Sequence, residues 1–195
     1  MDKLFYLDVE TTGLDAKKNG IWQLAGIVEI GGKEEDRINL KMRPWDMSGV
    51  KNEDYALKMN NLTGDQLNEL PASAGQFAEF LSFMRKYVSP FDKADKFIMV
   101  GYNVRFDNDF VRQWFIKHGN DDFGSWFHRH YYDIMSVAMT YFRGNNIKPL
   151  NYKLETVGRF LGLVGDDANL HDAMYDIELT RAVDKTFIEL NSAPF

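Results

Sequence analysis

A short apolar strand that ends on two acids is the feature that most constrains this chain. Residues 5–13 read Phe-Tyr-Leu-Asp-Val-Glu-Thr-Thr-Gly, so hydrophobic side chains give way to Asp8 and Glu10 just before the chain turns. Successive side chains of a strand point to opposite faces, which places these two carboxylates on the same face. Neighbouring carboxylates repel each other unless a cation lies between them. The stretch predicts a site for one or two divalent metal ions, and a solvated acidic strand end is the simpler alternative.

Size and composition indicate an ordinary globular protein. The chain has 195 residues, of which 45% are hydrophobic and 27% are charged, and this length favours a single domain over residues 1–195. It contains no cysteine, which excludes disulfides, thiolate catalysis and cysteine zinc sites. No apolar run approaches the roughly 20 residues of a membrane span, and the N-terminus lacks the features of a signal peptide. We therefore expect a cytoplasmic protein with no membrane partner.

The overall charge restricts how such a protein could bind nucleic acid. The net charge is −6, which argues against binding of nucleic acid by bulk electrostatic attraction. A phosphate-bearing substrate would need local basic residues, or metal ions that offset the acids.

The rest of the chain alternates between strand and helix patterns. Apolar runs predict further strands over residues 21–30, 37–42, 97–101 and 131–134. Helical periodicity predicts helices over residues 72–88, from 106 to near 119, from the end of the strand over 131–134 to 142, over 152–161 and over 172–190. A weaker helical pattern runs from Asn52 to Thr63. The short Gly31-Gly32 turn favours a three-stranded antiparallel meander, and the later strands alternate with helices. These patterns predict an α/β domain with a mixed sheet of about five strands, some of them parallel, flanked by helices.

Two later stretches place acids at helix starts. Asp107 ends the segment Gly-Tyr-Asn-Val-Arg-Phe-Asp, which follows the strand over 97–101. Asp176 ends the segment His-Asp-Ala-Met-Tyr-Asp, which begins with His171. An acid in the first turn of a helix is stabilised by the helix dipole, so either acid alone has a simple structural explanation. A lone histidine is likewise more often a surface or core residue than a catalytic one.

In this order and at these separations, the three stretches resemble the exonuclease motifs of the DEDDh family of 3′–5′ exonucleases. This family includes the proofreading subunit of bacterial DNA polymerase III, oligoribonuclease and ribonuclease T. The resemblance covers nearly the whole chain and implies a ribonuclease H-like fold. It also implies that two divalent ions, Mg²⁺ or Mn²⁺, are held by four carboxylates: Asp8, Glu10, Asp107 and Asp176. His171 would be the general base, because the related subgroup with a catalytic tyrosine would need Tyr where this chain has Asp172.

The resemblance also implies contacts with the substrate. Thr11, Thr12 and Leu14 follow the first motif and are candidates for contacting the terminal nucleotide. Asn103 is a candidate for a substrate contact or for orienting Asp107. Weaker candidates for phosphate contacts, since scattered surface cations are usually just solvated, are Lys148, Lys153 and Arg159. Asp133 matches an acid of the family that we expect to be structural.

Two departures from the family pattern concern the substrate class. Tyr102 stands where many members have His, and Asn60-Asn61 replaces a usual His-Gly pair. Neither position is a metal ligand in the family, so these changes leave the choice between DNA and RNA open.

The expected function is a metal-dependent 3′–5′ exonuclease that releases nucleoside 5′-monophosphates from single-stranded nucleic acid, with DNA as the expected substrate and RNA as the alternative. A haloacid-dehalogenase-type phosphatase would use Asp8 as a covalent nucleophile, but it needs a further acid that Gly165-Asp166-Asp167 does not supply at the right spacing. A non-catalytic nucleic-acid-binding module would not need the complete set of acids. The chain ends soon after the last expected helix, which favours a free-standing nuclease or one that docks on a polymerase or replisome through its own surface.

Overall fold

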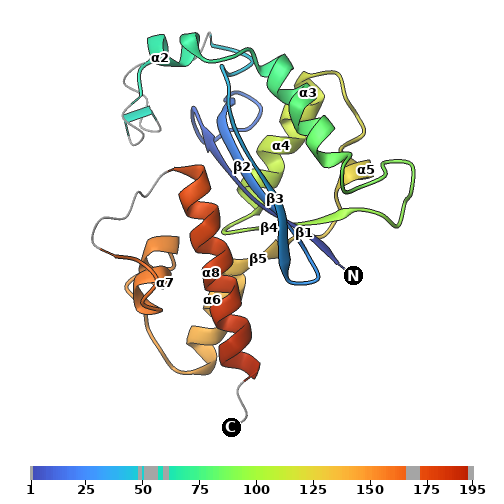
Figure 1. Ribbon diagram of the computed structural model, residues 1–195. Helices are drawn as coiled ribbons and strands as arrows, with labels where there is room; N and C mark the ends of the chain where they lie inside the picture. Colours follow the sequence, from blue (N-terminus) through green and yellow to red (C-terminus); the bar gives the residue numbers. More distant parts are fainter. Residues whose placement is uncertain (1, 48–49, 51–56, 59–61, 166–171, 193–195) are drawn as a thin grey trace.

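Five strands form one mixed sheet with helices on both faces (Figure 1). The structure is a computed structural model that describes residues 2–47, 50, 57–58, 62–165 and 172–192. The strands, in the spatial order β3-β2-β1-β4-β5, are β1 Lys3–Thr11, β2 Ile21–Ile30, β3 Lys33–Lys41, β4 Phe97–Gly101 and β5 Tyr132–Asp133. The mixed five-stranded α/β sheet expected from the sequence is confirmed.

Strand β1 lies at the centre of the sheet. It pairs antiparallel with β2, which pairs antiparallel with β3, so the expected meander is confirmed. On its other side β1 pairs parallel with β4, and β4 pairs parallel with β5. The predicted start of β3 at residue 37 is wrong. Gly31 and Gly32 both have positive φ angles, and such a two-residue turn lets pairing resume at once with Lys33 opposite Ile30.

The helices divide between the two faces of the sheet. They are α2 Gly64–Glu69, α3 Ser73–Met84, α4 Arg105–Lys117, α5 Phe123–Trp126, α6 Ile134–Gly144, α7 Leu154–Phe160 and α8 Ala173–Ser192. Helices α3, α4 and α5 cover one face, and α6, α7 and α8 cover the other (Figure 1). Among the residues that the structure describes, no helix has both the length and the hydrophobicity needed to cross a membrane.

Some predicted helix limits need correction. The predicted helix over 72–88 ends at Met84, because the last residues tighten into a turn in which the Lys86 and Tyr87 N–H groups bond to carbonyls three residues earlier. Helix α5 was not predicted, since its four residues are too few for a periodic pattern. The weaker helical pattern from Asn52 lies mostly outside the described residues, and α2 begins after it with Thr63 as its N-cap.

The alternation of side chains along β1 divides the core in two. Phe5, Leu7 and Val9 pack in the cluster beneath α3 and α4. Tyr6 packs in the cluster beneath α6 and α8. Because side chains alternate, Asp8 continues the row of Tyr6 and lies on the face that α8 covers. The two acids of β1 therefore lie at the edge of the face that α8 covers, where they meet the N-terminal turn of that helix.

Buried polar contacts fix α8 on the sheet. The Tyr6 hydroxyl donates to Asp184 Oδ2 at 2.6 Å, and only 1% of Asp184 is exposed. Arg181 on the same helix forms ion pairs of 2.7 Å with Glu29 of β2 and Glu34 of β3. Directional contacts of this kind are costly to break when they are buried. They hold α8 in one position, and that position brings the start of the helix to the end of β1.

Candidate active site

Three carboxylates from two distant parts of the chain converge at the end of β1. Asp8 and Glu10 extend from β1, and Asp176 lies in the first turn of α8. One oxygen from each residue lies within 4.8 Å of the others, and all three side chains are partly buried. Asp176, which follows the other two acids by more than 160 positions in the sequence, thus forms one cluster with them.

Asp107, the fourth acid of the sequence motifs, lies beside this cluster and contacts the backbone of β1. It occupies the first turn of α4 and is only 3% exposed. Its Oδ1 accepts a hydrogen bond of 3.0 Å from the Val9 N–H. The pairing of β1 with β4 ends at Tyr6, so Asp107 takes over as hydrogen-bond acceptor where β4 has ended. The structure therefore gathers three predicted ligands into one cluster and positions the fourth next to it.

The electrostatics of the site favour a bound cation. Burial raises the pKa of the Asp8 carboxyl well above its usual range, and the charges of Asp107 and Asp176 raise it further. Burial also raises the pKa of Asp107, although the hydrogen bond from Val9 opposes this shift. A divalent cation would relieve both the desolvation and the mutual repulsion. The donor atoms are all carboxylate oxygens, which are the ligands that Mg²⁺ and Mn²⁺ prefer, so the residues present fit such an ion.

Asp172 positions the start of α8. Its Oδ1 accepts hydrogen bonds from the Met174 and Tyr175 N–H groups, at 3.1 and 3.2 Å, as an N-cap residue does. Its Oδ2 accepts from the Gln23 side chain of β2 at 3.2 Å. Gln23 is fully buried and pairs with Glu10 across the two strands. This positioning role was not predicted from the sequence, although an Asp just before a helix is a capping signal.

The polar residues that follow the first motif are held within their own loop. The Thr12 N–H donates to the Gly20 carbonyl at 3.0 Å, and its hydroxyl accepts from the Gly20 N–H at 3.1 Å. The Thr11 hydroxyl donates to the Gly13 carbonyl at 2.7 Å, and both threonines are buried. Leu14 is 87% exposed and lines a cavity of about 630 Å³ together with Phe106. Of these three candidates, Leu14 alone presents its side chain to solvent.

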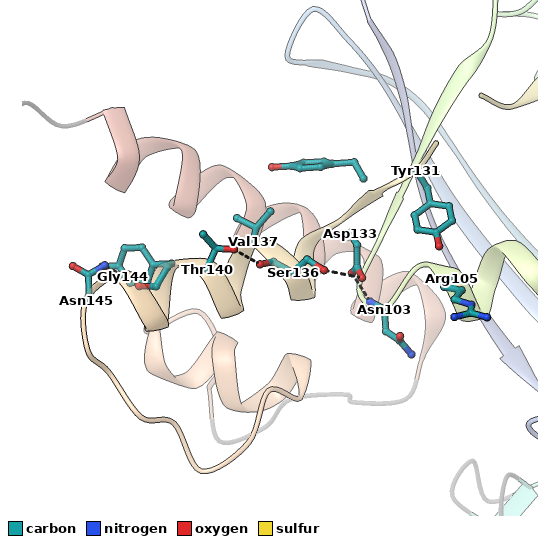
Figure 2. Close-up of a pocket in the computed structure, with 11 residues that line it drawn as sticks. Asn103, Arg105, Tyr131, Asp133, Ser136, Val137, Thr140, Gly144 and Asn145 are labelled. Atoms are coloured by element: carbon teal, nitrogen blue, oxygen red, sulfur yellow. Dashed lines mark hydrogen bonds between the residues drawn. The ribbon is translucent and has the colours of Figure 1, made fainter. Parts of the chain in front are cut away.

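Asn103 is held in place by Asp133. Asn103 has a φ angle of 61°, a left-handed conformation that Asn tolerates better than most residues. Its N–H donates to Asp133 Oδ1 at 2.9 Å, and the same oxygen accepts from the Met135 N–H at the start of α6. Asp133 thus has the structural role expected for it. The Asn103 side chain is exposed, as Figure 2 shows. His171, the expected general base, lies outside the described residues.

Comparison with known proteins assigns the family. Residues 5–183 match the model of the RNase_T exonuclease family. The chain belongs to this exonuclease family, which confirms the 3′–5′ exonuclease of the DEDD type expected from the sequence motifs. Membership of this family rejects the phosphatase alternative.

The chain also resembles parts of larger proteins. It is 26% identical over 187 residues to the PolC-type DNA polymerase III of Thermotoga maritima, a match that covers 94% of this chain and 12% of the polymerase. Its fold resembles E. coli exonuclease I in complex with a dT13 oligonucleotide, with a TM-score of 0.75 and 21% identity over 95% of this chain and 41% of that one. A zinc-bound complex of E. coli exonuclease I with single-stranded DNA gives a TM-score of 0.77, with 20% identity over 98% of this chain and 41% of that one.

The crowded carboxylates lead to a prediction about stability without metal. In EDTA, Asp8→Asn should raise the melting temperature by roughly 2–4 °C, corresponding to about 1 kcal/mol, because the variant buries no charge beside the other acids. The raised pKa of Asp8 means that the wild-type carboxylate destabilises the fold above that pKa. The advantage of the variant should therefore shrink as the pH falls below it.

Thermal melts in EDTA and in Mg²⁺ at several pH values test this prediction. Mg²⁺ should stabilise the wild type more than Asp8→Asn, because a ligand that binds only the folded state raises its stability. Asp121→Asn, which removes an exposed acid, is the matched control and should melt as the wild type does. A lower melting temperature for Asp8→Asn in EDTA would contradict the proposed electrostatic strain.

Proposed function

We propose that this exonuclease removes nucleoside 5′-monophosphates from the 3′ end of single-stranded DNA in a reaction that depends on divalent metal. The observation that carries the proposal is the cluster of Asp8, Glu10 and Asp176, whose oxygens lie within 4.8 Å of one another in a chain of the exonuclease family. The fold of exonuclease I, which has been captured with a dT13 oligonucleotide, supports DNA as the substrate. RNA is the second candidate within the same family.

Each acid has a distinct part in the proposed site. Asp8, Glu10 and Asp176 would hold two divalent ions, Mg²⁺ or Mn²⁺, and Asp107 would complete the ligand set from the neighbouring helix. Such ions stabilise the attacking and leaving oxygens of phosphodiester hydrolysis and lower the pKa of the attacking water. The Val9 N–H and the Asp172 cap keep the two helix starts in place. The protein thus holds the metal-binding carboxylates in place before any substrate arrives, which reduces the cost of organising the transition state.

His171 is the proposed general base. It precedes Asp176 by five residues, so the lead-in to α8 can carry the imidazole to the acid cluster. An imidazole titrates near neutral pH and can accept a proton from the attacking water. The leaving 3′ oxygen takes up a proton from solvent, and a mononucleotide is released.

The proposed binding site for the terminal nucleotide lies beside Leu14. Leu14 and Phe106 provide an apolar surface next to the start of α4, in a cavity of about 630 Å³. A base could stack or pack there, because every base has an apolar face. Thr11 and Thr12, whose hydrogen bonds hold their own loop, would position Leu14 against the terminal nucleotide, and the Asn103 side chain would contact the sugar or phosphate. The cytoplasm is the proposed location, and the PolC-type relatives suggest a polymerase as a partner.

Removal of one proposed ligand should abolish hydrolysis. We expect Asp176→Ala to lose well over tenfold in rate, which corresponds to more than about 1.4 kcal/mol of transition-state stabilisation. EDTA should abolish hydrolysis by the wild type, and added Mg²⁺ or Mn²⁺ should restore that hydrolysis. Glu178→Ala is the matched control, since Glu178 is an exposed acid of the same helix that pairs with Arg37 at the surface.

The measurement is release of mononucleotides from a 3′-labelled single-stranded DNA, with a single-stranded RNA of the same sequence assayed in parallel. Full activity in EDTA, or an Asp176→Ala variant that keeps more than a tenth of the wild-type rate, would contradict the metal-dependent mechanism. Faster hydrolysis of the RNA would replace DNA by RNA as the preferred substrate.

Removal of the proposed base should slow hydrolysis without weakening metal binding. His171→Ala should lose about 10²–10⁴-fold in rate, the usual contribution of a positioned general base. Its metal affinity should be unchanged, because all four carboxylates remain. Raising the pH should partly rescue the variant, since hydroxide then replaces the base.

Single-turnover hydrolysis of a short oligonucleotide against pH, at saturating Mn²⁺, separates this role from a structural one. In the wild type the acidic limb should follow an imidazole-like group that is absent from the variant. An unchanged rate near neutral pH would show that another residue is the base.

A further inference from the structure

A second cavity lies along the outer face of α6. Its volume is about 750 Å³, and its lining mixes polar and aromatic side chains. Figure 2 shows Asn103, Arg105 and Tyr131 at one end and Gly144 and Asn145 at the other, with Ser136 and Thr140 of α6 between them. Tyr132 and Tyr141 also line it. We call this cavity the α6 groove. Its residues have no part in the acid cluster.

Apart from Asn103 and Arg105, the residues that line the α6 groove come from a long stretch of this acidic chain that is poor in acids. Residues 123–154 contain one acid, Asp133, whereas the chain as a whole has a net charge of −6. The carboxylate of Asp133 is already occupied, since it accepts hydrogen bonds from Asn103 and the start of α6. The same stretch supplies exposed cations, namely Arg129, Arg143, Lys148 and Lys153. A polyanion would meet less repulsion along this groove than over the rest of the surface.

One end of the α6 groove adjoins the candidate active site. Asn103 lines the groove and precedes Asp107 by four residues. Asp133 also lines it, and its Oδ1 accepts a hydrogen bond of 2.9 Å from the Asn103 N–H. Arg105 faces this groove, while the next residue, Phe106, faces the cavity beside Leu14. The two cavities therefore flank the start of α4, whose first turn carries Asp107.

We propose that the α6 groove binds the single strand upstream of its 3′ end. This proposal rests on the proposed function and adds a binding surface to it. Tyr131, which is 38% exposed, stacks on a base, and Arg105 at the same end of the groove contacts a phosphate. Arg129 does not line the groove, but it is exposed two residues before Tyr131 and contacts a phosphate next to it. The rise of α6 spans about 16 Å, which is room for roughly three to five nucleotides. Stacking on aromatic rings with cations along the backbone is how sequence-independent sites hold single strands.

Removal of one stacking ring and one cation should weaken binding of long strands only. The double variant Arg129→Ala/Tyr131→Ala should bind a 5′-fluorescein-labelled single-stranded 15-mer about tenfold more weakly, with a smaller dependence on salt. Its kcat/KM for a dinucleotide, which cannot reach the groove, should match the wild type. The matched control is Lys33→Ala/Phe91→Ala. It removes an exposed cation and an exposed aromatic ring near the opposite end of the sheet.

Two single substitutions of opposite charge protect the test against a folding defect. Thr140 is exposed on α6, and both Glu and Arg are good helix formers. Thr140→Glu should weaken binding of the 15-mer, and Thr140→Arg should strengthen it. Fluorescence anisotropy measures all of these affinities, in EDTA so that the oligonucleotide is not expected to be hydrolysed.

The outcomes separate this proposal from the proposed function. Equal affinity of the Arg129/Tyr131 variant, the control and the wild type would overturn the α6 groove as a binding surface. An equal loss on dinucleotide and 15-mer would overturn it as well, because the defect would then lie in the active site. A wild type that binds the 15-mer through the groove but hydrolyses no oligonucleotide in Mg²⁺ or Mn²⁺ would contradict the proposed function and support the groove.

Discussion

Repulsion among carboxylates at the end of β1 is the constraint on which the rest of the structure depends. Asp8, Glu10 and Asp176 present oxygens within 4.8 Å of one another, and burial raises the pKa of Asp8 and of Asp107 beside it. Left alone, such a cluster would push α8 away from the sheet. The fold instead holds the acids together, so that a divalent cation gains the full benefit of neutralising them.

The contacts that oppose this repulsion lie away from the acids themselves. Tyr6 and Asp184 join β1 to the middle of α8 through a buried hydrogen bond of 2.6 Å. Arg181 joins the same helix to β2 and β3, and Asp172 joins its first turn to Gln23. Polar contacts to three strands therefore position this one helix, and with it the acid at its start. A substitution far from the acids can disturb them through α8.

Much of this organisation could be predicted from the sequence, and the exceptions have physical causes. The apolar runs of β2 and β4 predict both strands with the observed limits, since buried strands are hydrophobic throughout. The first residues of β3 are polar because they lie at the exposed edge of the sheet, so their pattern shows no strand. The convergence of Asp8 with Asp176 follows from the family motifs. The link between Asp172 and Gln23 does not, because it depends on the tertiary placement of α8.

Anomalous diffraction from crystals soaked in Mn²⁺ is the sharpest test of whether these carboxylates form a divalent metal site. We expect anomalous peaks within about 2.0–2.6 Å of carboxylate oxygens of Asp8, Glu10 and Asp176, with Asp107 next to them. The peaks should be absent from crystals of Asp176→Ala soaked in the same way, or strongly reduced. Mn²⁺ bound only elsewhere in the wild-type protein, or bound equally in the variant, would contradict the account.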